Sequence, residues 1–325
     1  MILKILTHIS RVLVGLLFIY SGFVKLVDPI GSQYKFQEYF SEGVLNMEFL
    51  IPYTLPFAIL LIISELVLGV MLIVGYKPKL TVWSIFGLNL IFLFLTWYSY
   101  TYNKVTDCGC FGDALKLTPK ETFYKNVVFM VFIVILIFGL KHIKPLISDK
   151  ISAIKTYATI VISLFITYYV LNHLPIIDFR AYSIGTDIAE GMKYQEGSDE
   201  VPPIHDFMIE TDENGDQLEN MLAKEKAMLI IMYNFEKTEK EGISAISKTA
   251  ANAKAKGYEV YVLTASYIED LAITQKEFNL PYTFGFCDET ALKTVIRANP
   301  GIVTVEKGII TGKWNWTDAD DVTLK

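Results

Sequence analysis

The sequence predicts a bundle of membrane-spanning α-helices followed by a compact α/β domain. Of the 325 residues, 52% are hydrophobic and only 20% are charged, whereas a soluble domain usually carries about 25% charged residues. The charges divide unevenly, with 14 basic and 9 acidic side chains in residues 1–175, and 15 basic and 26 acidic ones in residues 176–325. An apolar, basic half therefore precedes a polar, acidic half. The net charge of −6 gives no indication of nucleic-acid binding.

Five stretches of the first half are apolar enough to cross a bilayer, whose hydrocarbon core of about 30 Å requires roughly 20 helical residues. They are residues 9–27, 51–75, 80–100, 123–140 and 154–171. We expect the first stretch to remain as a span, because no small-x-small signal-peptide cleavage site follows it. We assign the first four spans to a domain of residues 1–145 and the fifth span to residues 146–175. We expect membrane lipid to contact the outer faces of all five.

The basic residues of the short loops indicate the orientation of the spans. If the N-terminus is cytoplasmic, the inner side carries Lys4, Arg11, Lys77, Lys79, Lys141, Lys144, Lys150 and Lys155. An odd number of spans then places the acidic half in the periplasm of a bacterial inner membrane. The loop between the third and fourth spans lies on the same outer side, where disulfides persist.

Glu65 stands out as an ionisable residue in the middle of the second apolar stretch. A charge inside a membrane is costly and marks function by default, so Glu65 is a candidate quinone contact or proton relay. The structural alternative is a polar contact with another helix, for which Lys25, Arg11 and Asn89 are candidates. We expect Lys25, near the outer end of the first span, to extend its ammonium group toward the membrane surface.

The most specific motif is Asp107-Cys108-Gly109-Cys110-Phe111-Gly112, between the third and fourth spans. A C-x-C pair can close a small, strained disulfide, in which Gly109 relieves backbone crowding, and a strained disulfide exchanges readily. Cys108 and Cys110 are therefore the candidate catalytic residues. A structural disulfide, two unpaired thiols or half of a metal site remain alternatives. We expect no metal, because no other cysteine or histidine is close in sequence, and no nucleotide, because no nucleotide-binding motif is present.

Three segments of the first half resemble DoxX-like and MauE-like membrane proteins. They are residues 11–29, the series Glu65, Gly69 and Gly75, and the CGCFG loop, which is typical of the MauE branch, the methylamine-utilisation proteins. The resemblance covers about residues 5–145 and implies a four-helix core with the fifth span as an extension. It also implies disulfide formation and, through the DoxX-like proteins, quinone-coupled sulfur oxidation, which makes quinone the candidate cofactor.

The acidic half is predicted to hold a linker over residues 176–200 and an α/β domain over residues 201–325. The linker assignment depends on the alternation of polar, acidic and glycine residues without apolar periodicity. The expected strands are residues 205–209, a partner after the turn at 212–215, 228–235, 259–265, 281–286, 301–307 and 309–314. The expected helices are residues 242–256, 270–278 and 289–297.

This order resembles a TlpA-type thioredoxin-like fold over about residues 200–318. The segment Ala298-Asn299-Pro300-Gly301 matches the cis-proline segment of that family, which implies a cis bond before Pro300. Redox thioredoxins carry C-x-x-C after the strand that is residues 228–235 here, but residues 236–242 contain no cysteine. Thiol exchange needs a thiolate, so this domain cannot run dithiol chemistry there. Cys287, its only cysteine, is either a small buried residue or a partner in a mixed disulfide.

Two functions agree with these observations. In the first, which we favour, an inner-membrane protein exchanges disulfides through Cys108 and Cys110 with quinone coupling, while the thioredoxin-like domain docks an extracytoplasmic protein partner or thiol substrate. In the second, the chain is a non-catalytic subunit or scaffold of a cell-envelope complex, and the domain is a binding module. Small-solute transport would depend on Glu65 alone. Whether the protein is an enzyme stays open at this point.

Overall fold

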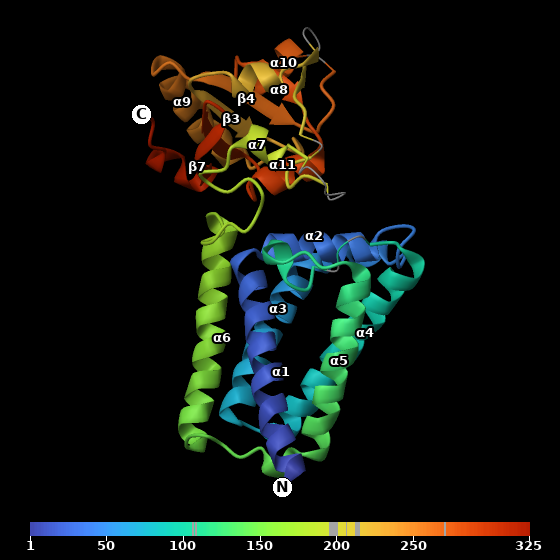
Figure 1. The fold of residues 1–325 in the computed structure, drawn as a ribbon. Helices are drawn as coiled ribbons and strands as arrows, with labels where there is room; N and C mark the ends of the chain where they lie inside the picture. Colours follow the sequence, from blue (N-terminus) through green and yellow to red (C-terminus); the bar gives the residue numbers. More distant parts are fainter. Residues whose placement is uncertain (106, 108, 195–200, 206, 212–214, 270) are drawn as a thin grey trace. The chain divides into compact units, whose positions relative to one another are not determined.

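The computed structural model describes residues 1–325 except 106, 108, 195–200, 206, 212–214 and 270 (Figure 1). Two compact units make up the chain, Met1–Leu171 and Asn172–Lys325. The first consists of helices and the second is built around a β-sheet.

Among the described residues, five helices are long and apolar enough to cross a membrane. They are α1 (Ile2–Val27), α3 (Thr54–Val74) with the short 3-10 helix Glu48–Tyr53 before it, α4 (Pro78–Tyr102), α5 (Pro119–Phe138) and α6 (Asp149–Asn172). They confirm the five apolar stretches predicted from the sequence, with ends that differ by up to several residues. The chain is therefore a membrane protein.

The interior of the first unit is formed by side chains of α1, α3, α4 and α5. Its buried cluster comprises Val14, Phe18, Leu72, Val82, Ile85, Ile133, Leu136 and Ile143. Helices α1 and α3 can approach closely because residue 69 is glycine. A Cβ there would lie only 2.9 Å from the main-chain oxygen of Gly15. Large apolar side chains such as Leu16, Ile91 and Phe165 are exposed, as expected of surfaces that face lipid.

A further helix, α2 (Pro29–Phe40), lies across one end of the bundle (Figure 1). Asp28 caps it, accepting a hydrogen bond of 3.0 Å from the Gly31 amide, and a proline opens it. Phe36 and Phe40 pack edge-on against Phe57 of α3. The sequence analysis did not predict this helix, because its mixed polar and aromatic residues form no long apolar stretch.

The second unit contains a mixed sheet whose described strands run in the order β2-β1-β5-β4-β3-β6-β7. The strands are β1 (Glu210–Thr211), β2 (Gly215–Asp216), β3 (Ala227–Ile231), β4 (Glu259–Thr264), β5 (Thr283–Phe286), β6 (Gly301–Glu306) and β7 (Ile309–Asn315). Strands β3, β4 and β5 are parallel to one another, whereas β6 is antiparallel to both of its neighbours, β3 and β7. The described helices are α7 (Ile188–Gly191), α8 (Leu218–Leu222), α9 (Lys240–Ala255), α10 (Leu271–Phe278) and α11 (Glu289–Val295).

All five residues of the central strand β3 are buried, because both faces of the sheet are covered by apolar clusters. From residue 228 onward, the predicted strands and helices agree with the structure to within a few residues. The first predicted strand, residues 205–209, is wrong for its described residues, 205 and 207–209. Pairing begins only at Glu210, opposite Asp216 and Phe286, because the Asp216 side chain, rather than a neighbouring strand, accepts the Ile209 amide.

The predicted linker is also wrong for its described part, residues 176–194. Tyr182 and Ile188 are buried in the core of the second unit, and the Ile188 amide donates to the main-chain oxygen of Gly308 at 3.0 Å. Asp187 forms an isolated bridge with Ile309. Periodicity failed here because an irregular segment contributes single apolar residues without a helical or strand repeat. Residues 195–200 lie outside the described residues.

Candidate functional site

A buried ion pair joins α1 and α3 near the end of the bundle that α2 crosses. The ammonium of Lys25 lies 2.9 Å and 3.1 Å from the two carboxylate oxygens of Glu65 and 2.6 Å from the hydroxyl of Ser21. Lys25 is 5% exposed and Glu65 1%. The backbones of α1 and α3 can approach closely here because residue 22 is glycine. A Cβ at this position would lie 3.2 Å from the Cβ of Glu65. The pair therefore holds two charges in a membrane interior, each compensated by the other.

This geometry decides among the partners considered for Glu65. Lys25 does not extend to the membrane surface as predicted, because the carboxylate on the neighbouring helix holds its ammonium inside. Arg11 instead donates to the main-chain oxygens of Leu72, Ile73 and Lys144. Asn89 donates to the main-chain oxygen of Asn126 at 3.3 Å.

Ser21 connects the ion pair to the cysteine loop. Its hydroxyl accepts from Lys25 and lies 2.8 Å from the main-chain oxygen of Cys110 and 3.1 Å from Glu65 Oε2. A serine hydroxyl has one proton to donate, so it can serve only one of these two acceptors at a time. The sequence analysis did not single out Ser21, and only its spacing of four residues from Lys25 on one helix could have indicated it.

Phe111 and Gly109 of the same loop pack on the bundle. Phe111 is buried against Tyr20, at 5.6 Å between ring centroids, and lies 4.2 Å below the Lys125 ammonium. Gly109 has φ +65 and donates its amide to Asp107 Oδ1 at 3.0 Å. A Cβ there would lie 2.7 Å from Lys35 Cγ, so the loop needs glycine at this position for space as well as for conformation.

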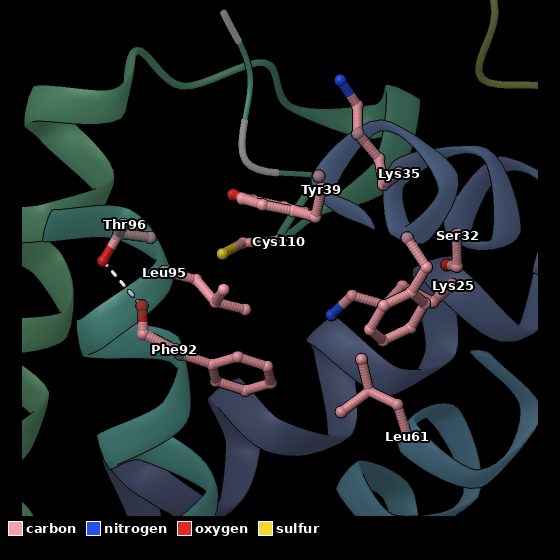
Figure 2. Close-up of a pocket in the computed structure, with 11 residues that line it drawn as sticks. Lys25, Ser32, Lys35, Tyr39, Leu61, Phe92, Leu95, Thr96 and Cys110 are labelled. Atoms are coloured by element: carbon pink, nitrogen blue, oxygen red, sulfur yellow. Dashed lines mark hydrogen bonds between the residues drawn. The ribbon is translucent and has the colours of Figure 1, made fainter. Parts of the chain in front are cut away.

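Cys110 and Lys25 line one cavity, with an empty volume of about 510 Å³ that includes its open side. The lining residues belong to α1, α2, α3, α4 and the cysteine loop (Figure 2). The remaining lining residues are Ser32, Lys35, Phe36, Tyr39, Leu61, Phe92, Leu95, Thr96 and Gly109. Cys108 lies outside the described residues. Within the described part of the chain, no group of three or more His, Cys, Asp or Glu side chains could hold a metal ion.

In the second unit, Cys287 is a buried residue at the end of β5. It is 2% exposed, and burial raises the pKa of its thiol to about 12. A thiol with so high a pKa provides almost no thiolate near neutral pH. The structure therefore describes Cys287 as a small core residue, and the mixed disulfide considered above stays a prediction.

Residues 234–239, which follow β3, are hydrogen-bonded to the segment that contains Pro300. The Asn299–Pro300 bond is cis, as the resemblance implies. The Asn299 side chain donates to the main-chain oxygen of Asn234 at 2.7 Å, and the Glu239 amide donates back to the main-chain oxygen of Asn299 at 3.3 Å. Thr238 Oγ1 also donates to the main-chain oxygen of Asn234, at 2.8 Å. Hydrogen bonds therefore hold residues 234–239 against the segment that contains Pro300.

A second buried charge cluster joins the segment predicted as a linker to β7. Lys313 Nζ is 2.5 Å from Asp178 Oδ2 and 3.0 Å from the main-chain oxygen of Tyr182, and Arg180 also donates to Asp178. Burial lowers the pKa of Lys313 to about 7, and the charge of Arg180 adds to this effect. Burial alone would raise the pKa of Asp178, but Arg180 and Lys313 outweigh it and lower that pKa.

The fold and the site together define a membrane protein with a helical unit, a charged site inside it, and an α/β unit after it. The family model of the methylamine utilisation protein MauE matches residues 3–139. The matched part spans α1 to α5 and includes Ser21, Lys25, Glu65 and the cysteine loop. No curated protein and no solved structure matches the chain.

Proposed function

We propose that the protein is an inner-membrane component of thiol–disulfide exchange, with Cys108 and Cys110 as its reactive pair and a membrane quinone as the electron acceptor. The observation that carries this proposal is the location of Cys110, which lines a cavity of the helical unit together with Lys25. A nearby cation favours the thiolate that exchange requires. The similarity to the MauE family over residues 3–139 covers the same loop and supports the proposal.

The proposed cycle balances as follows. A dithiol substrate attacks the Cys108–Cys110 disulfide through a mixed disulfide, leaves as an oxidised product, and reduces the pair. Reoxidation breaks two S–H bonds and forms one S–S bond. The two electrons and two protons released pass to the quinone, which becomes a quinol with two new O–H bonds. No metal or nucleotide takes part in this cycle.

The second unit serves, in this proposal, as a thioredoxin-like docking module of the TlpA type. Its parallel strands β3 to β5, antiparallel β6 and β7, and cis-proline before β6 are compatible with that fold. It carries no cysteine in residues 236–242, and Cys287 is buried, so it would bind a partner protein without exchanging disulfides with it.

The proposed orientation has a cytoplasmic N-terminus. Because the cysteine loop follows the third span and the second unit follows the fifth, both lie on the same side of the membrane. The excess of basic residues in the other loops makes that side the periplasm. A docked extracytoplasmic partner would then meet the cysteines in an oxidising compartment.

The test follows the thiols of the full chain in intact cells. The thiols are trapped with acid and alkylated with a mass tag, in cells with and without quinone synthesis. We expect the pair to become reduced when quinone is absent, and Cys108→Ser or Cys110→Ser to trap a mixed disulfide with the partner. Cys287→Ser is the matched control and should behave as wild type.

A pair that stays oxidised in all conditions, together with single variants that behave as wild type, would refute this function. The cysteine-free thioredoxin-like module would then favour the alternative of a scaffold subunit in an envelope complex. Purification of the intact chain in mild detergent would test that alternative by identifying the proteins that remain bound.

A further inference from the structure

The cavity beside Cys110 combines apolar walls with a buried cationic group. Phe36 of α2, Leu61 of α3, and Phe92 and Leu95 of α4 form much of its wall. Small-molecule sites characteristically pair such walls with a few polar groups, and here Lys25 and Cys110 are among the lining residues. A planar ring that carries an oxygen acceptor fits this combination.

Lys25 can supply the hydrogen bond that such an oxygen needs. An ammonium group has three N–H donors. One serves Ser21, while the contacts of 2.9 Å and 3.1 Å to Glu65 go to a single carboxylate. One N–H can serve that carboxylate, which leaves another for a ligand in the cavity that Lys25 lines. A lipid acyl chain would fill apolar walls but would make no use of a buried ammonium.

We infer that this cavity binds the ring of a membrane quinone, with one quinone oxygen accepting a hydrogen bond from Lys25 Nζ. The inference rests on the proposed function and assigns the acceptor site within it. As two electrons leave the cysteine pair, negative charge develops on the quinone oxygens. Lys25 stabilises that charge and donates a proton to the adjacent oxygen, and a proton released from the thiols restores the ammonium. The other thiol proton passes to the second quinone oxygen, so both thiol protons end on the quinol and Lys25 is unchanged over the cycle.

The test measures binding separately from chemistry. The oxidised, full-length protein in phosphatidylcholine nanodiscs is labelled with photoreactive short-chain benzoquinone and naphthoquinone probes, and the sites of labelling are mapped by mass spectrometry. Leu61→Trp fills the cavity. Leu60→Trp is its matched control, because the neighbouring side chain is 66% exposed. The double variant Lys25→Met/Glu65→Leu removes the ammonium without leaving a buried charge unpaired.

We expect wild-type labelling on α3 or α4 peptides that line the cavity. Labelling should fall at least tenfold in Leu61→Trp and remain at the wild-type level in Leu60→Trp. The double variant should weaken binding by about tenfold or more, as for the loss of one hydrogen bond to a charged group. Size-exclusion elution at the wild-type position shows that each variant is folded.

Equal labelling of Leu61→Trp and wild type, or labels that map only outside the cavity, would overturn the site, even if the cysteine pair responds to quinone in cells. Site-specific labelling of a protein whose cysteines never respond would instead refute the proposed function and leave the binding site standing. The wild-type map decides the first question without any variant.

Discussion

Removing one partner of the Lys25–Glu65 pair should destabilise the helical unit by about 3–5 kcal/mol, the cost of leaving a buried charge uncompensated. The structure supports this range. In Glu65→Leu, an ammonium that is 5% exposed loses the carboxylate at 2.9 Å and 3.1 Å and keeps Ser21 and the face of the Phe92 ring, whose centroid is 5.9 Å away. The lost hydrogen bond to a charged group accounts for about 1.5–3 kcal/mol, and the desolvation cost of the ammonium left unpaired adds to it.

Two variants isolate the effect of burial. The double variant Lys25→Met/Glu65→Leu replaces both charges with apolar groups of similar size, and should recover most of the lost stability. Glu38→Gln breaks the pair between Lys35 and Glu38, whose side chains are 30% and 36% exposed. Because an exposed pair contributes about 0–1 kcal/mol, this variant should remain near wild type.

The assay is denaturant unfolding of the full chain in detergent micelles, followed by circular dichroism of the helices. A double-mutant cycle then gives the coupling energy between residues 25 and 65. The reasoning fails if Glu65→Leu is no less stable than Glu38→Gln. It also fails if the effects of Lys25→Met and Glu65→Leu simply add in the double variant.

Three further predictions concern other parts of the chain. Gly109→Ala should lower the free energy of unfolding by about 1–2 kcal/mol, because residue 109 has a left-handed conformation and the new Cβ would clash with Lys35. It should also speed alkylation of Cys110. Gly87→Ala, with open space around its new Cβ, should cause neither change. Cys287, with a pKa of about 12, should have a thiolate fraction on the order of one in ten thousand at about pH 8, so mass spectrometry should find it unmodified in the native protein and alkylated in denaturant. Rapid native alkylation would contradict its burial. Because the folded pKa of Lys313 is about 7 against an ordinary 10.5, the unfolded chain binds more protons between these values. The free energy of unfolding of the second unit should therefore rise with pH across that window, measured by urea titration with tryptophan fluorescence. Lys313→Met should flatten the rise, and an unchanged slope would show that Lys313 does not cause it.

Much of the architecture can be predicted from the sequence, because it depends on local patterns. The length and apolar content of a segment are enough to identify a span, since the thickness of the bilayer sets the length and its hydrocarbon core requires apolar side chains. Runs of β-branched residues between turn signals identify β3, β4, β6 and β7 in the same way. The CGC spacing and the Asn299–Pro300 segment are equally local, so the candidate cysteines and the cis bond could be read before any tertiary structure was known.

The content of the site was decided only by tertiary structure. Lys25 and Glu65 are 40 residues apart, and whether Lys25 faces lipid headgroups or a carboxylate depends on how α1 packs against α3. Ser21 becomes a link to Cys110 only because the loop folds back onto α1. The segment of residues 176–194 shows the same limit, since its apolar residues have no periodicity but fit the core of the second unit. In each case the physical reason is the same: desolvation and hydrogen bonding act on the neighbours that packing brings together, and those neighbours are distant in sequence.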